Sequence, residues 1–154
     1  MAGRGLTHIG ASGEARMVDV SAKPIVARMA RARGRIVLAR ETLALIASDR
    51  IAKGNVLATA RVAGIMAGKS CSGLIPLCHP LCVDRLDVSL ELEDDGIAIE
   101  AVAAIASKTG VEMEALTAVS AAALTIWDMC KAVDHAMRIE GIVLLEKTKG
   151  EAPS

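Results

Sequence analysis

Two runs of alternating apolar and polar side chains, joined by a short acidic turn, constrain the fold of this chain most. The first run covers residues 86–93 and the second covers residues 97–105, with Asp94, Asp95 and Gly96 between them. A period of two places successive side chains on opposite faces of a strand, and a short turn with glycine brings two such strands side by side. The sequence therefore predicts a β-hairpin that buries one face.

The other periodic segments predict two more strands and three helices. We expect strands over residues 26–38 and 137–145, and helices over residues 40–49, 55–67 and 111–135. Thr109 and Glu112 fit a capping box at the start of the longest helix, and Gly68 fits a helix stop.

This order predicts a single α+β domain over residues 1–154, with about the first 20 residues forming a loosely ordered arm. The predicted fold is a ferredoxin-like antiparallel sheet with helices on one face. The two consecutive helices before the hairpin depart from that plan, so one helix is an addition to it.

The apolar side chains are almost entirely aliphatic. Hydrophobic residues make up 53% of the chain, yet it has no Phe, no Tyr and a single Trp, Trp127. Small side chains fill little space, so such a core needs close approach between backbones. A chain this short would also struggle to bury so much aliphatic surface alone, and we therefore predict a homo-oligomer.

Charge and cysteine usage narrow the functional class. Lysine plus arginine equals aspartate plus glutamate at 18 each, which is unusual for a nucleic-acid-binding protein. Charged residues interrupt every apolar run before it reaches membrane-spanning length, which predicts no membrane insertion. Four cysteines without a recognisable secretory signal predict reduced thiols and a cytoplasmic location.

A phosphate-binding P-loop is not favoured by residues 63–70, although they end in Gly68-Lys69-Ser70. Ala63 stands where the motif needs its first glycine. The segment also runs from a helix into a loop, whereas a P-loop follows a strand and opens a helix.

Two prolines, Pro76 and Pro80, restrict the backbone around Cys78 and His79. A histidine held in this way is a candidate site residue, although an ordinary packing role remains open. Cys78, His79 and Cys82 could also ligate zinc, which would make the protein a zinc-stabilised oligomeric scaffold. Structural zinc sites usually need a fourth ligand, so we predict no metal site.

Charged groups at three other places are candidates for chemistry or anion binding. Asp128 and Lys131 share one face of the long helix, where neighbouring apolar residues could partly desolvate them for acid–base work. The alternative is an ordinary surface ion pair. Lys108 precedes the start of that helix, a position suited to an anion or simply to capping. Four arginines could form a solvated strand face or a basic wall: Arg28, Arg31, Arg33 and Arg35.

Taken together, the motifs resemble the cyclic pyranopterin monophosphate synthase family, also called molybdenum cofactor biosynthesis protein C. The matching segments are 6–9 (LTHI), 17–23 (MVDVSAK), 60–65 (ARVAGI), 74–80 (LIPLCHP), 108–117 (KTGVEMEALT) and 128–132 (DMCKA). They follow the family's order and span nearly the whole chain.

The resemblance implies a lyase of molybdenum cofactor biosynthesis with a ferredoxin-like subunit. Its substrate is 3′,8-cyclo-7,8-dihydroguanosine 5′-triphosphate, and its products are cyclic pyranopterin monophosphate and pyrophosphate. It further implies a hexamer, a trimer of dimers, with each active site at a subunit boundary. We expect no cofactor held by the protein, and Mg²⁺ would arrive on the triphosphate. A non-catalytic nucleotide-binding module of the same fold is the alternative.

The resemblance also implies roles for particular residues. Asp128 matches the catalytic acid–base, and Lys131 and Lys53 match the lysines of chemistry and triphosphate binding. The positions matching the substrate pocket are Leu77, Cys78, His79, Met113, Glu114, Glu112, Arg28, Lys23, Asp19 and Lys147. The tail around Lys147 lacks the family's glycine-rich loop, and His135 replaces a common lysine. We expect Lys53, His79, Asp128 and Lys131 to converge, across a boundary between chains.

Overall fold

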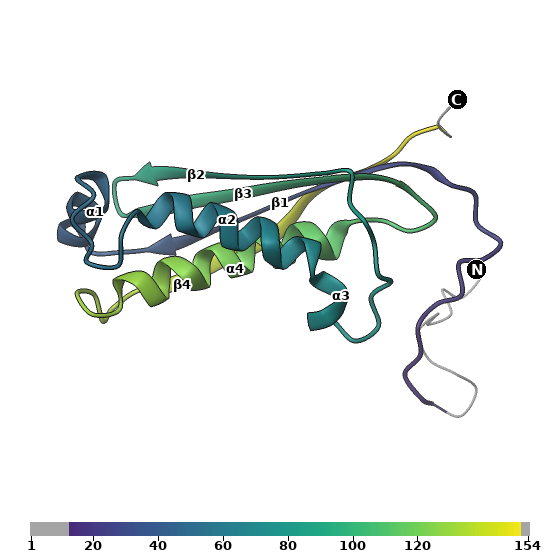
Figure 1. Cartoon of the computed structure of the whole chain (residues 1–154), viewed down its shortest axis with the longest axis horizontal. Coiled ribbons are helices and arrows are strands. Elements are labelled where there is room, and N and C mark those ends of the chain that lie inside the picture. Colours follow the sequence, from purple (N-terminus) through teal and green to yellow (C-terminus); the bar gives the residue numbers. More distant parts are fainter. Residues whose placement is uncertain (1–12, 152–154) are drawn as a thin grey trace, which may run out of the picture.

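A four-stranded antiparallel sheet is the frame of the protein (Figure 1). The computed structural model describes residues 13–151. The strands are β1 (Val26–Val37), β2 (Arg85–Glu93), β3 (Gly96–Ser107) and β4 (Arg138–Lys149), and they lie in the order β2-β3-β1-β4. Each neighbouring pair is antiparallel. This arrangement confirms the ferredoxin-like fold. Residues 6–9 and most of the proposed arm lie outside the described residues.

The hairpin forms as the alternating pattern predicts. Leu92 pairs with Ile97 next to the turn, and the register continues to Arg85 opposite Ala104. The alternate residues of β3 from Ile97 to Ile105 are buried against the helices, whereas Glu100 on the other face is partly exposed. The period of two therefore set which face of the sheet joined the core.

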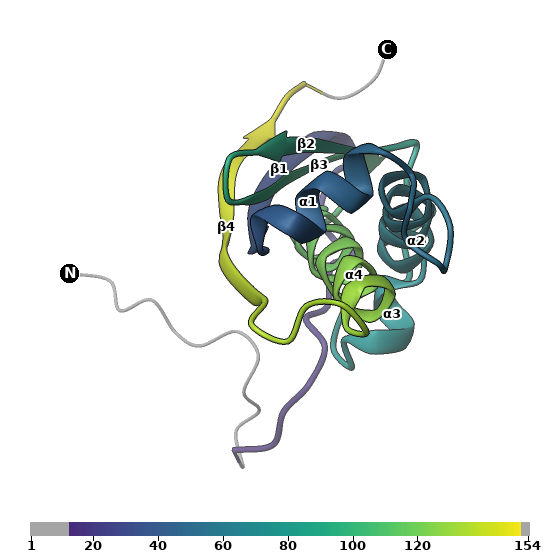
Figure 2. The same cartoon turned by 90° about the vertical axis from the view of Figure 1, so that its left-hand side faces the viewer.

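In the part of the chain that the structure describes, four helices accompany the sheet: α1 (Arg40–Ala47), α2 (Val56–Lys69), α3 (Cys71–Leu74) and α4 (Glu112–Cys130). The pair α2 and α4 covers one face, with α4 beneath β1 and β3 and α2 beside it (Figures 1 and 2). Helix α1 lies at one end of the sheet instead, where its Leu43 and Ile46 join the core. The two consecutive helices of the sequence are thus an end cap, α1, followed by a layer helix, α2.

The buried carboxylate of Asp134 anchors α1. Its Oδ2 accepts hydrogen bonds from the Ala39 backbone N–H at 2.8 Å and from the Thr42 hydroxyl at 3.1 Å. Its Oδ1 accepts one from the Ala136 N–H at 3.0 Å. Burial acts to raise the pKa of Asp134, but these hydrogen bonds outweigh it and hold the pKa below its usual value.

Three local predictions were wrong. Helix α4 begins at Glu112, with Val111 at its N-cap and no side-chain cap, so the capping box on Thr109 does not form. It ends at Cys130 rather than near residue 135, because the chain turns there and carries Asp134 to α1. Gly68 does not stop α2, which continues to Lys69, and the short α3 that follows was not predicted.

Glycines let α2 approach α4 closely, as the aliphatic composition led us to expect. A Cβ atom on Gly64 would lie 2.8 Å from the Ala118 carbonyl oxygen of α4, and one on Gly68 would lie 3.0 Å from the Glu114 carbonyl oxygen. No side chain fits between the two backbones at these points. Within residues 13–151, no helix is both long and apolar enough to cross a bilayer.

Gly64→Ala should lower the free energy of unfolding by about 1–3 kcal/mol, the usual effect of overpacking. The added methyl group would meet the Ala118 carbonyl oxygen of α4, which can move only if the helix moves. Chemical denaturation measures the change. Gly73→Ala is the matched control, because a Cβ there meets nothing within 4 Å. Equal stabilities of the two variants would contradict this account of the packing.

Candidate active site

The predicted site residues form two clusters at opposite ends of α4. One cluster surrounds a cavity near the N-terminal end of α4, where the loop after α3 and the segment before β1 meet it. The other lies at the C-terminal end, beside the loop between α1 and α2. Figure 1 shows these two ends on opposite sides of the molecule.

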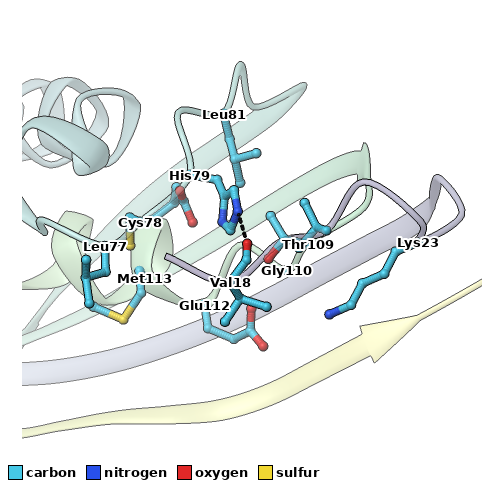
Figure 3. A pocket seen from close by; sticks show the side chains of 12 residues that line it. Val18, Lys23, Leu77, Cys78, His79, Leu81, Thr109, Gly110, Glu112 and Met113 are labelled. Carbon is cyan, nitrogen blue, oxygen red and sulfur yellow. Dashed lines mark hydrogen bonds between the residues drawn. The ribbon is translucent and has the colours of Figure 1, made fainter. Parts of the chain in front are cut away.

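The cavity has a volume of about 380 Å³ and three walls (Figure 3). The strap, which we define as residues 17–23, forms one wall, and the other two are residues 77–81 and the segment that opens α4. It is lined by these predicted substrate-binding residues: Lys23, Leu77, Cys78, His79, Glu112, Met113 and Glu114. Asp19 is absent from the lining. Its carboxylate accepts a hydrogen bond from the Ser21 N–H at 2.8 Å and so shapes the strap.

His79 is held by the strap in a single tautomer. Its Nε2 lies 2.8 Å from the Val18 carbonyl oxygen, the contact drawn in Figure 3. A carbonyl oxygen only accepts hydrogen bonds, so Nε2 carries the proton and Nδ1 has the lone pair of the neutral ring. His79 can therefore accept a proton only at Nδ1 while this contact lasts.

Two groups of the cavity have raised pKa values. Burial raises the pKa of Cys78 to about 11, with Cys71 and Glu114 acting in the same direction, so Cys78 is a thiol at neutral pH. Glu114 is only 3% exposed, and burial, aided by the charge of Glu112, raises the pKa of its carboxyl group. A raised pKa suits this carboxyl group to donating a proton or a hydrogen bond to a ligand.

Glu114→Gln should raise the melting temperature at pH 8 by roughly 3 °C and leave it unchanged at pH 4. In the unfolded chain Glu114 ionises near its ordinary value of 4.5, whereas the folded protein resists that ionisation. The free energy of unfolding therefore falls as pH rises above 4.5, and glutamine removes this dependence. Calorimetry at both pH values measures it, with exposed Glu91→Gln as control. An equal shift at both pH values would contradict the assignment.

A second cavity of about 250 Å³ adjoins the first and supplies positive charge. It shares Gly110 and Glu112 with the first cavity and is lined also by Arg28, Lys147 and Lys149. Lys147 Nζ lies 3.2 Å from Glu112 Oε1. Gly110 makes room for this pair, because a Cβ at residue 110 would overlap the Glu112 carboxylate. The annex, which we define as this second cavity, suits an anionic part of a ligand.

Arg31 and Arg35 of β1 are paired with carboxylates rather than forming a basic wall, and Arg33 is exposed. Arg31 pairs with Glu100 and Glu146, and Arg35 pairs with Glu93, Asp95 and Glu140 on the face away from the helices. Arg28 points instead to the end of β3, where its guanidinium donates to the Ser107 and Lys108 carbonyl oxygens at 3.2 and 3.1 Å.

The second cluster is an ion triad of Lys53, Asp128 and Lys131. Asp128 Oδ2 lies 2.7 Å from Lys53 Nζ, and its Oδ1 lies 2.6 Å from Lys131 Nζ. Hydrogen bonds from these two lysines lower the pKa of Asp128 to about 2. The Asp128 and Lys131 side chains are 56% and 58% exposed, so within residues 13–151 no residue of the same chain strongly desolvates this pair.

The two clusters cannot act on the same atoms within one chain. Residues 112 and 128 lie sixteen residues apart on α4, which at 1.5 Å per residue separates them by about 24 Å. Catalytic groups work within about 3 Å of the atoms they serve. The chain thus brings Lys53, Asp128 and Lys131 together and places His79 with Glu112 and Glu114 elsewhere.

Lys108 is the residue of this region whose role the sequence did not reveal. Its Nζ donates a hydrogen bond to the Ser21 carbonyl oxygen of the strap at 2.8 Å. The position of Lys108 just before α4 suggested anion binding. It gave no indication of a contact with Ser21, which is 87 residues away in the sequence. Within residues 13–151, no three His, Cys, Asp or Glu side chains are arranged to hold a metal ion.

The fold and the cavity define a ferredoxin-like α+β protein with a pocket of titratable and cationic side chains at the start of its longest helix. The model of the MoaC family matches residues 17–150. The chain belongs to the MoaC family.

Relatives in this family are similar over nearly their whole length. A protein of Desulfitobacterium hafniense is 55% identical over 96% of this chain and 91% of its own length. A protein of Parvibaculum lavamentivorans is 51% identical over 99% of this chain and 96% of its own. A third, from Mycobacterium tuberculosis, is 54% identical over 96% of this chain and 87% of its own. The first two are named cyclic pyranopterin monophosphate synthase, and the third cyclic pyranopterin monophosphate synthase 1.

Proposed function

We propose that this chain is a cyclic pyranopterin monophosphate synthase, a lyase of molybdenum cofactor biosynthesis. It converts 3′,8-cyclo-7,8-dihydroguanosine 5′-triphosphate to cyclic pyranopterin monophosphate and releases pyrophosphate. The observation that carries the proposal is that the pocket lined by Cys78, His79 and Glu114 adjoins the annex, which is lined by Arg28, Lys147 and Lys149. A heterocycle that bears a triphosphate has a ring system that fits the pocket and an anionic chain that fits the annex.

The pocket and the annex divide the work of binding. The ring system lies among Leu77, Cys78 and Met113, where Glu114 and His79 Nδ1 can exchange hydrogen bonds with its nitrogen and oxygen atoms. The triphosphate extends toward Arg28, Lys147 and Lys23, whose positive charges favour polyanion binding. Asp19 contributes by shaping the strap that carries Lys23.

The chemistry needs proton transfers and stabilisation of phosphate charge. Ring opening and closure move protons to and from nitrogen and oxygen. A sugar hydroxyl then loses its proton to solvent and attacks the α-phosphorus. The bond from the α-phosphorus to the bridging oxygen breaks, and that oxygen leaves as part of pyrophosphate. Asp128, with a pKa of about 2, is a weak base, so its best role is to orient the ammonium groups of Lys53 and Lys131. Those ammonium groups donate protons or stabilise the departing negative charge.

The complete site takes the ion triad from one subunit and the pocket from another. The separation of the clusters along α4 supports this, since one chain alone cannot bring them together. Exposed aliphatic side chains supply surface for contact between subunits, among them Leu124 on α4 and the consecutive residues 142–145 on the edge strand β4. The proposed assembly is a hexamer built as a trimer of dimers.

Any Mg²⁺ in this reaction arrives on the substrate. The two carboxyl groups of the pocket are poorly placed to hold a cation of their own, because Glu112 pairs with Lys147 and Glu114 has a raised pKa. We also propose a cytoplasmic location, which the four free thiols support.

Turnover of the cyclised dihydroguanosine triphosphate tests the function. The purified protein should release one pyrophosphate per substrate and form a pterin that becomes fluorescent on oxidation. Binding of the substrate without pyrophosphate release would support a non-catalytic nucleotide-binding module and contradict the proposal. Guanosine triphosphate is the control substrate, since it lacks the bond between sugar and base that the reaction rearranges.

A further inference from the structure

We propose that Lys108 is a positioning residue for substrate binding, because it holds the strap, residues 17–23, over the cavity. The strap carries Lys23, so the effect of Lys108 on the ligand passes through Lys23. The inference rests on the proposed function for the nature of the ligand, and on the hydrogen bonds around the strap for the role of Lys108.

Two side chains of the body hold the strap by its main chain. Lys108 Nζ donates to the Ser21 carbonyl oxygen at 2.8 Å, and His79 Nε2 donates to the Val18 carbonyl oxygen at 2.8 Å. Within the strap, Asp19 accepts from the Ser21 N–H, and the Lys23 N–H donates to the Val20 carbonyl oxygen at 3.0 Å. The strap is therefore a preformed turn fastened at two points, one on each side of Asp19.

Packing contributes little to the position of the strap. None of the residues 17–23 is buried, and Met17 is 48% exposed. A segment without buried side chains gains little from the hydrophobic effect. Its position over the cavity then depends on polar contacts such as the one from Lys108, which is charged and so among the stronger kinds of hydrogen bond.

The backbone of Lys108 is held in place by Arg28, one of the residues that line the annex. The Arg28 guanidinium donates to the carbonyl oxygens of Ser107 and Lys108, which holds the backbone of Lys108 at the end of β3. The strap is thereby connected to Arg28 and the opening of α4. Figure 3 shows the result, with Lys23 reaching toward the side of the cavity where Glu112 lies.

The alternative role for Lys108 is direct contact with the phosphates. The geometry disfavours it, since Lys108 lines neither cavity and its ammonium group is engaged on the strap. The two roles separate in experiment. A positioning residue controls the strap before any ligand is present, whereas a direct phosphate ligand does not.

The test compares Lys108→Met with Lys108→Arg, which keeps a charged donor, and with Lys69→Met, which changes an exposed lysine of α2 that lines neither cavity. Lys108→Gln is a second neutral variant, so the result does not depend on the folding of one protein. Hydrogen exchange of the ligand-free peptide covering residues 17–25 should be about tenfold faster in Lys108→Met, as expected for loss of one charge-assisted hydrogen bond. The arginine and Lys69 variants should match the wild type.

Kinetics with the cyclised triphosphate provide the second measurement. Lys108→Met should raise KM by about tenfold with kcat within about twofold of wild type, and Lys108→Arg should restore KM. Unchanged exchange in Lys108→Met, or a lowered kcat with unchanged KM, would overturn the proposal. A raised KM with unchanged exchange would indicate direct phosphate contact and would also overturn it. No turnover by the wild-type protein would contradict the proposed function, and the exchange comparison would still decide whether Lys108 holds the strap.

Discussion

Asp128→Asn should lower kcat by about 10²–10⁴-fold, the range typical of impaired general acid–base catalysis, because the lysines that Asp128 orients would be misplaced. The Asp128 carboxylate binds both Lys53 Nζ and Lys131 Nζ, at 2.7 and 2.6 Å. An amide of the same size has no negative charge, so the two ammonium groups would repel each other and lose their common orientation. The melting temperature should stay within about 2 °C of wild type, since this exposed ion pair contributes little to stability.

Steady-state kinetics and calorimetry on the same preparation measure both quantities. Asp87→Asn is the matched control, because Asp87 is also an exposed aspartate in an ion pair, with Arg85, and lies outside both clusters. Asp128 should remain ionised from pH 4 to pH 9, given its pKa of about 2. Any loss of activity on acidification within that range must therefore come from another group. An Asp128→Asn protein that assembles and turns over at the wild-type rate would remove Asp128 from the mechanism.

Two inactive variants, His79→Asn and Asp128→Asn, should recover activity when they are combined in one assembly. If each site takes His79 from one chain and Asp128 from another, random mixing in equal amounts leaves about one site in four intact. Co-expression with two different tags and purification through both gives the mixed assemblies, and their rate should approach a quarter of wild type. Each variant alone should stay inactive.

The same experiment contains its own control. Lys53 and Asp128 contact each other within one chain, so mixing Lys53→Met with Asp128→Asn leaves no intact triad and should restore nothing. Recovery in this control mixture would show that Lys53 and Asp128 need not come from the same chain. Failure of the His79 and Asp128 mixture to recover would show that the two clusters do not combine across a subunit boundary.

Local patterns in the sequence predicted the elements of the fold because their physical causes are local. The alternation through Leu90 and Ile99 specified the hairpin and its buried face, and the order of the elements specified the ferredoxin-like sheet. The end of α4 was mispredicted because it depends on Asp134 reaching Ala39, a contact across 95 residues. No local periodicity encodes such a contact.

The composition of the pocket was predictable, but its geometry was not. Motif resemblance pointed to Cys78, His79 and Glu114, which the structure places around one cavity. The burial that raises the pKa of Glu114, the tautomer of His79 and the hold of Lys108 on the strap all arise from segments distant in the chain. The isolated position of the ion triad at the far end of α4 likewise follows from the length of the helix and the packing of α1.

The hydrogen bonds of Asp134 pre-organise the ion triad. Asp134 joins the start of α1 to the segment that follows α4, and these two elements lead directly to Lys53 and Asp128. The entropy of bringing the two residues together is therefore lost when the protein folds rather than when a ligand arrives. Loosening of α1 by heat or acid should disperse the triad while the sheet is still intact, so that inactivation precedes global unfolding.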